Sequence, residues 1–251
     1  NIMDLNMNLR SNIYVLNLYS QIKDLSCEDK EKKLLGVFKE LAEHILSGYF
    51  LIKKNQSDSF VKVHPTCVEF YCHEEGEGKD KIKDYSAYHR NKEDRTLDKS
   101  VFPLGILHNH ISGIDMTFEQ GEDPANTIRL SALIREFRID DSGKKEDKYD
   151  MEYINIEKKK NGGIVTKPTY LYDALYSQFS IFDGFSIQWI DGEKKAVLEE
   201  SSELRINVPE YEVKNNKHVP VPQEETTAED ILTKNEKYKQ CLRKWKFKLK
   251  Q

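Results

Sequence analysis

One long amphipathic segment near the N-terminus, followed by β-type segments with no linker between them, limits this chain to a mixed fold. Apolar residues recur at intervals of three and four from Leu34 to Ile45, which predicts a helix. Ser26 is placed to cap this helix and Gly48 to end it. Because no linker separates two independent core patterns, we expect a single α+β domain that spans residues 1–251.

The rest of the chain alternates apolar segments with polar ones. Two short apolar stretches flank a charged loop, so residues 151–165 predict a hairpin. Outside the core pattern we expect a helical extension at 1–25, a long polar loop at 73–100 and a Pro-rich loop at 213–227. Strands are predicted at 49–53, 61–71, 130–134, 186–190, 195–199 and 244–250, apolar segments at 101–110 and 114–118, and a second helix at 169–179.

Composition excludes several classes of protein. With 251 residues, 38% hydrophobic and 33% charged, the chain is neither collagen-like nor a low-hydrophobicity disordered protein, and about 73% of its surface can be buried. No apolar run approaches the roughly 18–20 residues that a membrane helix needs, and the first residues lack the pattern of a signal peptide. The four cysteines form no CxxC pair and are typical of reduced thiols, so we expect a cytoplasmic protein that binds no membrane.

Charge is distributed unevenly along the chain. The net charge is −4, but residues 237–251 hold seven basic residues and no acidic one, which leaves −11 on the other 236 residues. In the last predicted strand, alternation puts the apolar Trp245, Phe247 and Leu249 on one face and the lysines on the other. Lys244, Lys246 and Lys248 would then either follow a nucleic-acid backbone or protect a sheet edge from pairing with another chain.

A first candidate site centres on a predicted strand end. Glu69 lies at the end of the strand 61–71, and a carboxylate in such a place can deprotonate water. Arg135, on a later apolar segment, can orient both the carboxylate and the water. Tyr71 and His89 offer two flat faces that can enclose a planar ligand. A solvent-facing strand glutamate is the alternative interpretation of Glu69.

Two further constellations compete with the first. His108 and His110 share a strand face and Asp115 follows them, a set that can ligate a metal ion in a hydrolase; the alternative is a pair of locally hydrogen-bonded histidines. Cys67 or Cys72 could act as a nucleophile, but no orienting residue accompanies either of them.

Several segments, taken in order, resemble those of the methylpurine (alkyladenine, or 3-methyladenine) DNA glycosylase family. Val68-Glu69-Phe70-Tyr71 is similar to the family's V-E-x-E-A-Y strand, and Leu133-Ile134-Arg135 to its L-L/I-R strand. His110-Ile111-Ser112-Gly113 stands where the family has Y-G-x-Y/H, so His110 or Ile111 would replace its intercalating tyrosine. Weaker matches are Leu41–Gly48 to LAR-x-LLG, Asp84–Arg90 to D-x-A-x-H, Arg205–Val208 to R-I/V-G-V and Lys244–Phe247 to P-W-R-F.

This resemblance implies a fold and a function. The fold would be a curved, mostly antiparallel sheet with flanking helices. The reaction would be hydrolysis of the N-glycosidic bond of a flipped, alkylated or otherwise modified base in double-stranded DNA, leaving an abasic site. Glu69 would be the base and Arg135 its positioning residue, while Tyr71, His89, His110 and Ile111 would contact the base and its surroundings. No metal or cofactor is required, and we expect a monomer associated with a prokaryotic-type nucleoid. The alternatives are the metal-dependent hydrolase and an inactive nucleic-acid-binding module.

Overall fold

A computed structural model describes the chain in ten segments. Side chains are described in all of them except 3–4, 106, 211–214 and 217–220, where only the backbone is. The predicted motif 205–208 lies outside the described residues. The described segments are 3–4, 17–84, 87–90, 101–102, 105–121, 126–145, 151–199, 211–214, 217–220 and 243–250.

The core of the fold is one curled, ten-stranded sheet, in which every described pairing is antiparallel. Seven strands follow the order β1-β4-β5-β7-β3-β2-β9, while β12 pairs with β3, and β6 and β8 pair with β7. The strands are β1 Met3–Asp4, β2 Tyr49–Lys54, β3 Phe60–Glu74, β4 Ile106–His110, β5 Gly113–Thr117, β6 Gln120–Gly121, β7 Thr127–Asp140, β8 Ile164–Val165, β9 Phe185–Ile190 and β12 Lys246–Lys248.

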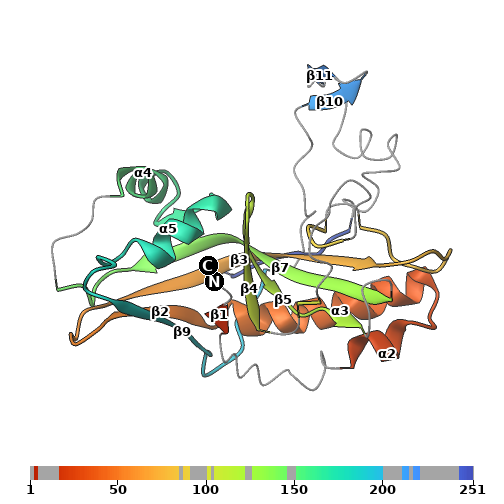
Figure 1. The fold of residues 1–251 in the computed structure, drawn as a ribbon, viewed down its shortest axis with the longest axis horizontal. Coiled ribbons are helices and arrows are strands. Elements are labelled where there is room, and N and C mark those ends of the chain that lie inside the picture. The colour runs from red at the N-terminus through yellow and green to blue at the C-terminus, as the bar shows by residue number, and fades with distance from the viewer. Residues whose placement is uncertain are drawn as a thin grey trace.

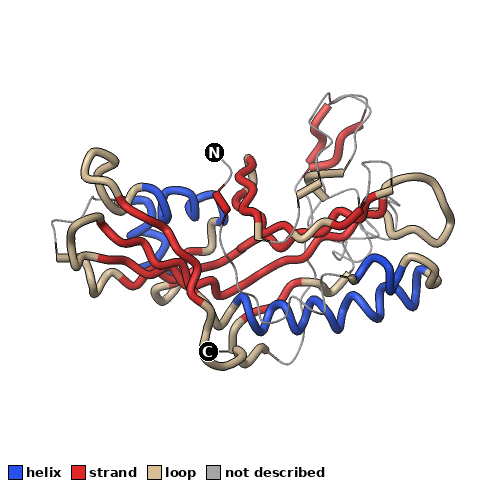
Figure 2. Tube along the Cα trace, turned by 60° about the horizontal axis from the view of Figure 1, so that its bottom comes forward, coloured by secondary structure: helices blue, strands red, loops and turns tan. Residues whose placement is uncertain are grey.

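The described helices lie toward opposite ends of this sheet, α2 and α3 at one end and α4 and α5 at the other (Figures 1 and 2). They are α2 Leu18–Ile22, α3 Cys27–Ile45, α4 Glu152–Lys160, the 3-10 turn η1 Pro168–Tyr170 and α5 Leu171–Tyr176. None of the helices in the described part of the chain is long and apolar enough to cross a membrane. The α+β class with a curled antiparallel sheet is therefore confirmed, while the finer likeness to a glycosylase fold stays a prediction.

The predicted N-terminal helix is α3, and its apolar stripe packs on the sheet. Ser26 caps it by accepting a hydrogen bond from the Asp29 N–H at 3.2 Å, as the sequence predicted. Phe38 stacks on Phe70 of β3 at a ring-centroid distance of 4.6 Å and meets Trp245 edge-on at 5.0 Å. The face of β3 that carries Phe70 is thus the core face. Trp245 and Phe247 are buried there, which confirms the predicted apolar face of the last strand.

Residues 151–165 do not form the predicted hairpin. Glu152–Lys160 is the helix α4, with Glu152 in its first turn and three lysines in its last, an arrangement that suits the helix dipole. Only Ile154 of this helix is buried, so the apolar signal in the sequence was too short to distinguish a helix from a strand.

Other predicted boundaries also shift. The polar loop begins after Glu74, because β3 continues through His73 and Glu74. Residues 195–199 form one isolated bridge, Leu198 with Leu249, rather than a strand. The extension 1–25 holds β1 as well as α2, and the Pro-rich loop holds most of a two-stranded hairpin, β10 Tyr211–Lys214 with β11 Lys217–Pro220. These strands form because their backbones pair with other strands. Sequence periodicity does not show which strands will pair, so it could not predict these elements.

Candidate functional site

The sheet has a polar face opposite the face that packs on α3. Side chains alternate along a strand, and the strand register aligns Glu69 of β3 with Leu133 of β7 and Asp115 of β5, and Asp115 with His108 of β4. We call this surface the polar face. Its members on the four central strands are Glu69, Tyr71, His73, His108, His110, Asp115, Thr117, Arg129, Ser131, Leu133 and Arg135. Both predicted constellations, the glutamate site and the histidine pair, therefore lie on one surface.

Glu69 is a buried carboxylate with one hydrogen-bond donor and one ion-pair partner. It is 1% exposed, and its Oε2 lies 3.1 Å from Arg135 Nε. The Tyr71 hydroxyl donates a hydrogen bond to Glu69 Oε1 at 2.7 Å. The Arg135 side chain is 28% exposed, so it extends from the buried carboxylate to the protein surface. A solvated strand glutamate, the alternative interpretation, does not describe this residue.

Arg135 reaches Glu69 because β7 bulges at this point. Ile134 pairs with Val68 and Glu136 pairs with Cys67, so Arg135 is an extra residue without a partner on β3. A second bulge lies beside it, since Pro65 pairs with Phe137 and leaves Thr66 without a partner on β7. Bulges change the direction of side chains and are common next to active sites. Here the bulge at Arg135 places both Arg135 and Glu136 beside the polar face.

The histidine pair forms an aromatic cluster with the segment 87–90. Tyr88 stacks on His110 at 4.5 Å, and His89 meets His108 edge-on at 4.1 Å. His89 Nδ1 also lies 2.8 Å from Glu119 Oε1. The segment therefore reaches β4 and Glu119, two residues after the end of β5, and it covers that part of the polar face. Tyr71 contacts Glu69, whereas His89 contacts His108 and Glu119. The two rings predicted to enclose a base therefore lie against different groups of residues.

Several polar atoms of this cluster are buried without a hydrogen-bond partner among the described residues: His89 Nε2, His108 Nδ1, His110 Nε2 and Asp115 Oδ1. His110 Nε2 lies 3.2 Å from Asp115 Oδ2 but is not aligned for a hydrogen bond. Burial lowers the pKa of His108 to about 4, helped by the neighbouring His89 and opposed by Asp115, so this imidazole is neutral at pH 7.

The predicted metal ligands share a face, and His110 lies next to Asp115, but the three side chains do not form a set of metal ligands in the described part of the chain. His108 lies opposite Asp115 in the strand register, and Ser131 Oγ lies 3.3 Å from Asp115 Oδ2. Across the described segments, no group of three or more His, Cys, Asp or Glu side chains is arranged to hold a metal ion. The cysteine hypothesis also lacks support, because burial raises the pKa of the Cys67 thiol, which keeps it protonated.

A buried charge network closes the polar face at the far end of β3. Arg129 Nη1 donates to Glu119 Oε2 at 2.8 Å and its Nε lies 3.2 Å from Glu75 Oε1. His73 Nδ1 accepts a hydrogen bond from the Asp84 N–H at 3.0 Å, and burial lowers the pKa of His73 to about 4. These contacts hold the loop after β3 against the sheet.

Ile111 and the terminal lysines lie beside the polar face, and Lys246 and Lys248 are half-buried. Ile111 lies in the two-residue turn between β4 and β5 and is 87% exposed. In β12, Lys246 is opposite Glu69 and Lys248 is opposite Cys67, so both lysines share the face of the carboxylate. Lys244 is exposed just before this strand. The predicted DNA-backbone lysines thus border the candidate catalytic group.

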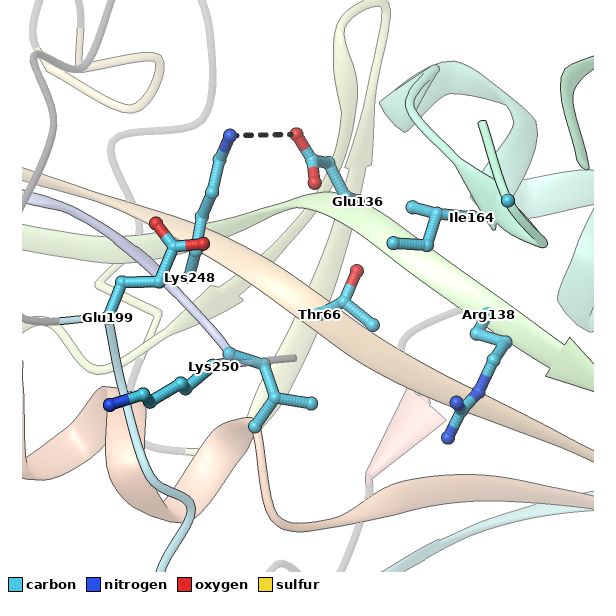
Figure 3. Close-up of a pocket in the computed structure, with 9 residues that line it drawn as sticks. Thr66, Glu136, Arg138, Ile164, Glu199, Lys248 and Lys250 are labelled. Atoms are coloured by element: carbon cyan, nitrogen blue, oxygen red, sulfur yellow. Dashed lines mark ion pairs between the residues drawn. The ribbon is translucent and has the colours of Figure 1, made fainter. Parts of the chain in front are cut away.

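Sequence reasoning missed a cavity of about 400 Å³ beside the two bulges (Figure 3). Its polar lining includes Thr66, Glu136, Arg138, Glu199 and Lys248. No spacing in the sequence marks these residues as neighbours, because they come from four separate segments and meet only through bulged strand pairing. Of these residues, only Lys248 was predicted to have a role.

Comparison with known proteins does not place the chain in a family: no family model, no curated protein and no solved structure matches it.

Proposed function

We propose that this protein is a monofunctional DNA glycosylase that hydrolyses the N-glycosidic bond of a modified base. The observation that carries the proposal is the buried Glu69 carboxylate, held by Arg135 at 3.1 Å and by the Tyr71 hydroxyl at 2.7 Å. The hydrogen bond at Oε1 and the ion pair at Oε2 together restrict the orientation of the carboxylate, as a general base requires. The resemblance of the segments around Glu69 and Arg135 to the methylpurine DNA glycosylases supports the same reaction.

The reaction follows from the charges of these groups. A base within a duplex cannot be reached, so the nucleotide must first rotate out of the stack. Glu69 then takes a proton from a water molecule whose oxygen bonds to C1′, while the glycosidic electron pair leaves with the base. The negative carboxylate favours the positive charge that develops on the sugar, and Arg135 positions the carboxylate. Because an oxygen of water replaces the base, the product is an abasic site.

Features along the polar face and its edges fit a duplex partner. Ile111 is an exposed apolar side chain at the tip of a hairpin, the kind of residue that enters between base steps when DNA is bent. Lys244, Lys246 and Lys248 provide a cationic row for the phosphate backbone, and Tyr71, His89 and His110 provide rings near the reacting base. We propose double-stranded DNA as the partner of a monomer, in the cytoplasm and at the nucleoid.

An assay for abasic sites tests this function directly. The substrate is a duplex oligonucleotide with one alkylated purine, and strand cleavage by alkali after incubation reports base release. We expect release by the wild-type protein and by the surface variant Glu40→Gln, and none by Glu69→Gln, whose DNA affinity stays within about tenfold because the base acts in the transition state.

The same assay separates the alternatives. Activity that survives EDTA agrees with the glycosylase, whereas activity lost with EDTA and in His108→Ala would move the function to the metal-dependent hydrolase. Tight DNA binding with no release from any alkylated purine would identify an inactive binding module. Full release by Glu69→Gln would remove Glu69 from catalysis.

A further inference from the structure

The β4–β5 hairpin has a second side, which the chemistry described above does not use. Side chains alternate along β4, so Asn109 leaves the strand on the side opposite to His108 and His110. A side-chain hydrogen bond joins Asn109 to Tyr176 of α5, and α5 packs against β5. Figures 1 and 2 show one end of α5 beside the hairpin. The hairpin therefore stands between His110 and α5.

Two neighbouring tyrosines of α5 lie at the surface on this second side. The ring centroids of Tyr172 and Tyr176 are 4.6 Å apart, and the rings are tilted by 30°. Tyr172 is 49% exposed, whereas Leu171, Ala174 and Leu175 of the same helix are buried. The apolar residues of α5 thus face the core, and the two rings offer a flat aromatic surface to solvent. We call Tyr172 and Tyr176 the tyrosine pair.

The tyrosine pair is fixed relative to the tip of the hairpin. Tyr176 is bonded to Asn109, which is two residues, or about 7 Å of strand, from Ile111 at the tip. Gly113, the first residue of β5, packs against η1 directly before α5, because a Cβ at this position would lie 3.2 Å from the Cβ of Pro168. Gly113 also has φ +142°, which favours glycine here. Ile111 and the tyrosine pair are therefore held in one arrangement.

Cations near the tyrosine pair favour a nucleic acid as the partner. Tyr153 of α4 meets Tyr170 of η1 edge-on at 4.9 Å, so α4 packs beside α5. Lys159 and Lys160 in the last turn of α4 and Lys167 before η1 are exposed, and none of them forms an ion pair with any described residue. Such lysines suit phosphates, and exposed rings suit bases, since every base has a face that can stack on an aromatic side chain.

The acidic side chains of α4 and α5 do not cancel this charge. Asp173 is hydrogen-bonded to Tyr153, and Glu157 accepts a hydrogen bond from the Thr166 hydroxyl at 3.1 Å. Glu152 lies in the first turn of α4, at the other end of the helix from the lysines. The lysine end of α4 therefore keeps a net positive charge.

The position of the tyrosine pair indicates which base it can meet, a step that rests on the proposed function. Glu69 lies on the polar face, so the nucleotide to be cleaved leaves the duplex on that side of the hairpin. Its partner on the other strand is then left unpaired, and Ile111 can enter the disrupted step. The tyrosine pair lies on the opposite side of the hairpin, the side left to this partner base.

We propose that the tyrosine pair binds an unstacked base of the distorted duplex, namely the base left unpaired when its partner is flipped toward Glu69. The Tyr172 ring stacks on this base, Ile111 fills the step beside it, and Lys159, Lys160 and Lys167 contact nearby phosphates.

The fluorescence of 2-aminopurine tests this contact directly. The probe is a duplex with 2-aminopurine opposite an abasic-site analogue, in which the fluorescent base has no pairing partner and no base has to be cleaved. Stacking should quench this fluorescence with the wild-type protein and with Tyr172→Phe, which keeps the ring, but not with Tyr172→Ala. We expect the affinity of Tyr172→Ala for this duplex to fall about five- to 150-fold, with little change for a fully paired duplex.

Phe182→Ala is the matched control. Phe182 is a 95% exposed aromatic ring in the turn before β9. This turn is bonded to the β2–β3 turn through the Asn55 N–H and the Gly184 carbonyl oxygen, so it belongs to a different part of the sheet from the hairpin. Quenching and affinity should both equal those of the wild type.

The outcomes separate this inference from the proposed function. If Tyr172→Ala abolishes the quenching while no form of the protein releases a base, the contact with an unpaired base stands and the glycosylase proposal alone fails. If Tyr172→Ala quenches and binds as the wild type does, the inference is refuted even where Glu69→Gln abolishes base release. If Tyr172→Ala changes only the molar mass measured by light scattering, the tyrosine pair is a protein interface and the inference is overturned.

Discussion

Lys246 lies opposite Glu69 in the pairing of β12 with β3, and the two side chains share the polar face of the sheet. The neighbouring Trp245 and Phe247 are buried on the other face, which fixes this orientation. Protection of a sheet edge does not require the lysines to lie next to a buried carboxylate. Protection of the edge and contact with a phosphate are compatible roles. The juxtaposition makes the DNA-binding role of the terminal lysines testable together with catalysis.

Replacing Lys244, Lys246 and Lys248 together by alanine should weaken the salt dependence of DNA binding. If each lysine neutralises one phosphate, the slope of log affinity against log salt falls by up to about 2.7. Fluorescence anisotropy with a labelled duplex over a range of salt concentrations measures this slope. The control is the triple variant of Lys32, Lys33 and Lys39, which are exposed lysines of α3. Equal slopes in the two triple variants would leave β12 with edge protection alone.

Substitution of Arg135 should lower kcat more than it changes KM. Arg135→Ala removes the guanidinium 3.1 Å from Glu69, and we expect kcat for base release to fall ten- to a hundredfold, since general acid–base catalysis contributes about 10²–10⁴. Arg135→Lys keeps the charge but not the fork geometry and should recover part of the rate. Single-turnover kinetics with alkylated duplex give both constants, and the pH profile of kcat should shift in Arg135→Ala. A variant with wild-type kcat and an unshifted profile would contradict the positioning role.

The ion pair of Lys30 with Glu74 should be essential to stability. Lys30 of α3 is 1% exposed, and its Nζ lies 2.9 Å from both Glu74 oxygens and 2.8 Å from the Asp80 carbonyl oxygen. Lys30→Met leaves a buried carboxylate without its counter-charge, so the free energy of unfolding should fall by about 3–5 kcal/mol.

Urea denaturation followed by circular dichroism measures this loss. The exposed Lys33→Met on the same helix should stay within about 0.5 kcal/mol of the wild type. Adding Glu74→Gln to Lys30→Met should restore part of the stability, because the buried charge is then removed. A loss below 1 kcal/mol in Lys30→Met would show that the pair is solvated in solution.

Acidification should destabilise the protein through His73. Its pKa is about 4 in the folded protein and 6.5 without burial, so between these pH values the unfolded chain binds a proton that the folded chain does not. The free energy of unfolding therefore falls as the pH is lowered from about 6.5 to 4, by up to about 1.4 kcal/mol per pH unit from this residue. Chemical denaturation at several pH values should show a shallower dependence in His73→Gln, which keeps an acceptor for the Asp84 N–H. The same dependence in both proteins would contradict a buried neutral imidazole.

Local patterns predicted much of the fold correctly. The stripe from Leu34 to Ile45 and its cap at Ser26 are properties of consecutive residues, so α3 could be read from the sequence. The alternation in residues 244–250 likewise predicted which side chains of β12 are buried. The hairpin predicted at 151–165 was wrong because its apolar pattern is short, and helix α4 has a single buried residue.

The sequence by itself determined the fold class, the apolar faces and a set of chemically capable residues around Glu69 and Arg135. Tertiary structure decided how those residues meet. Two bulges in the pairing of β3 with β7 place Arg135 and Thr66, and strand register puts the histidine pair and Glu69 on one face. The physical reason is that periodicity is a property of neighbouring residues, whereas register and bulges arise from pairing between strands far apart in the chain.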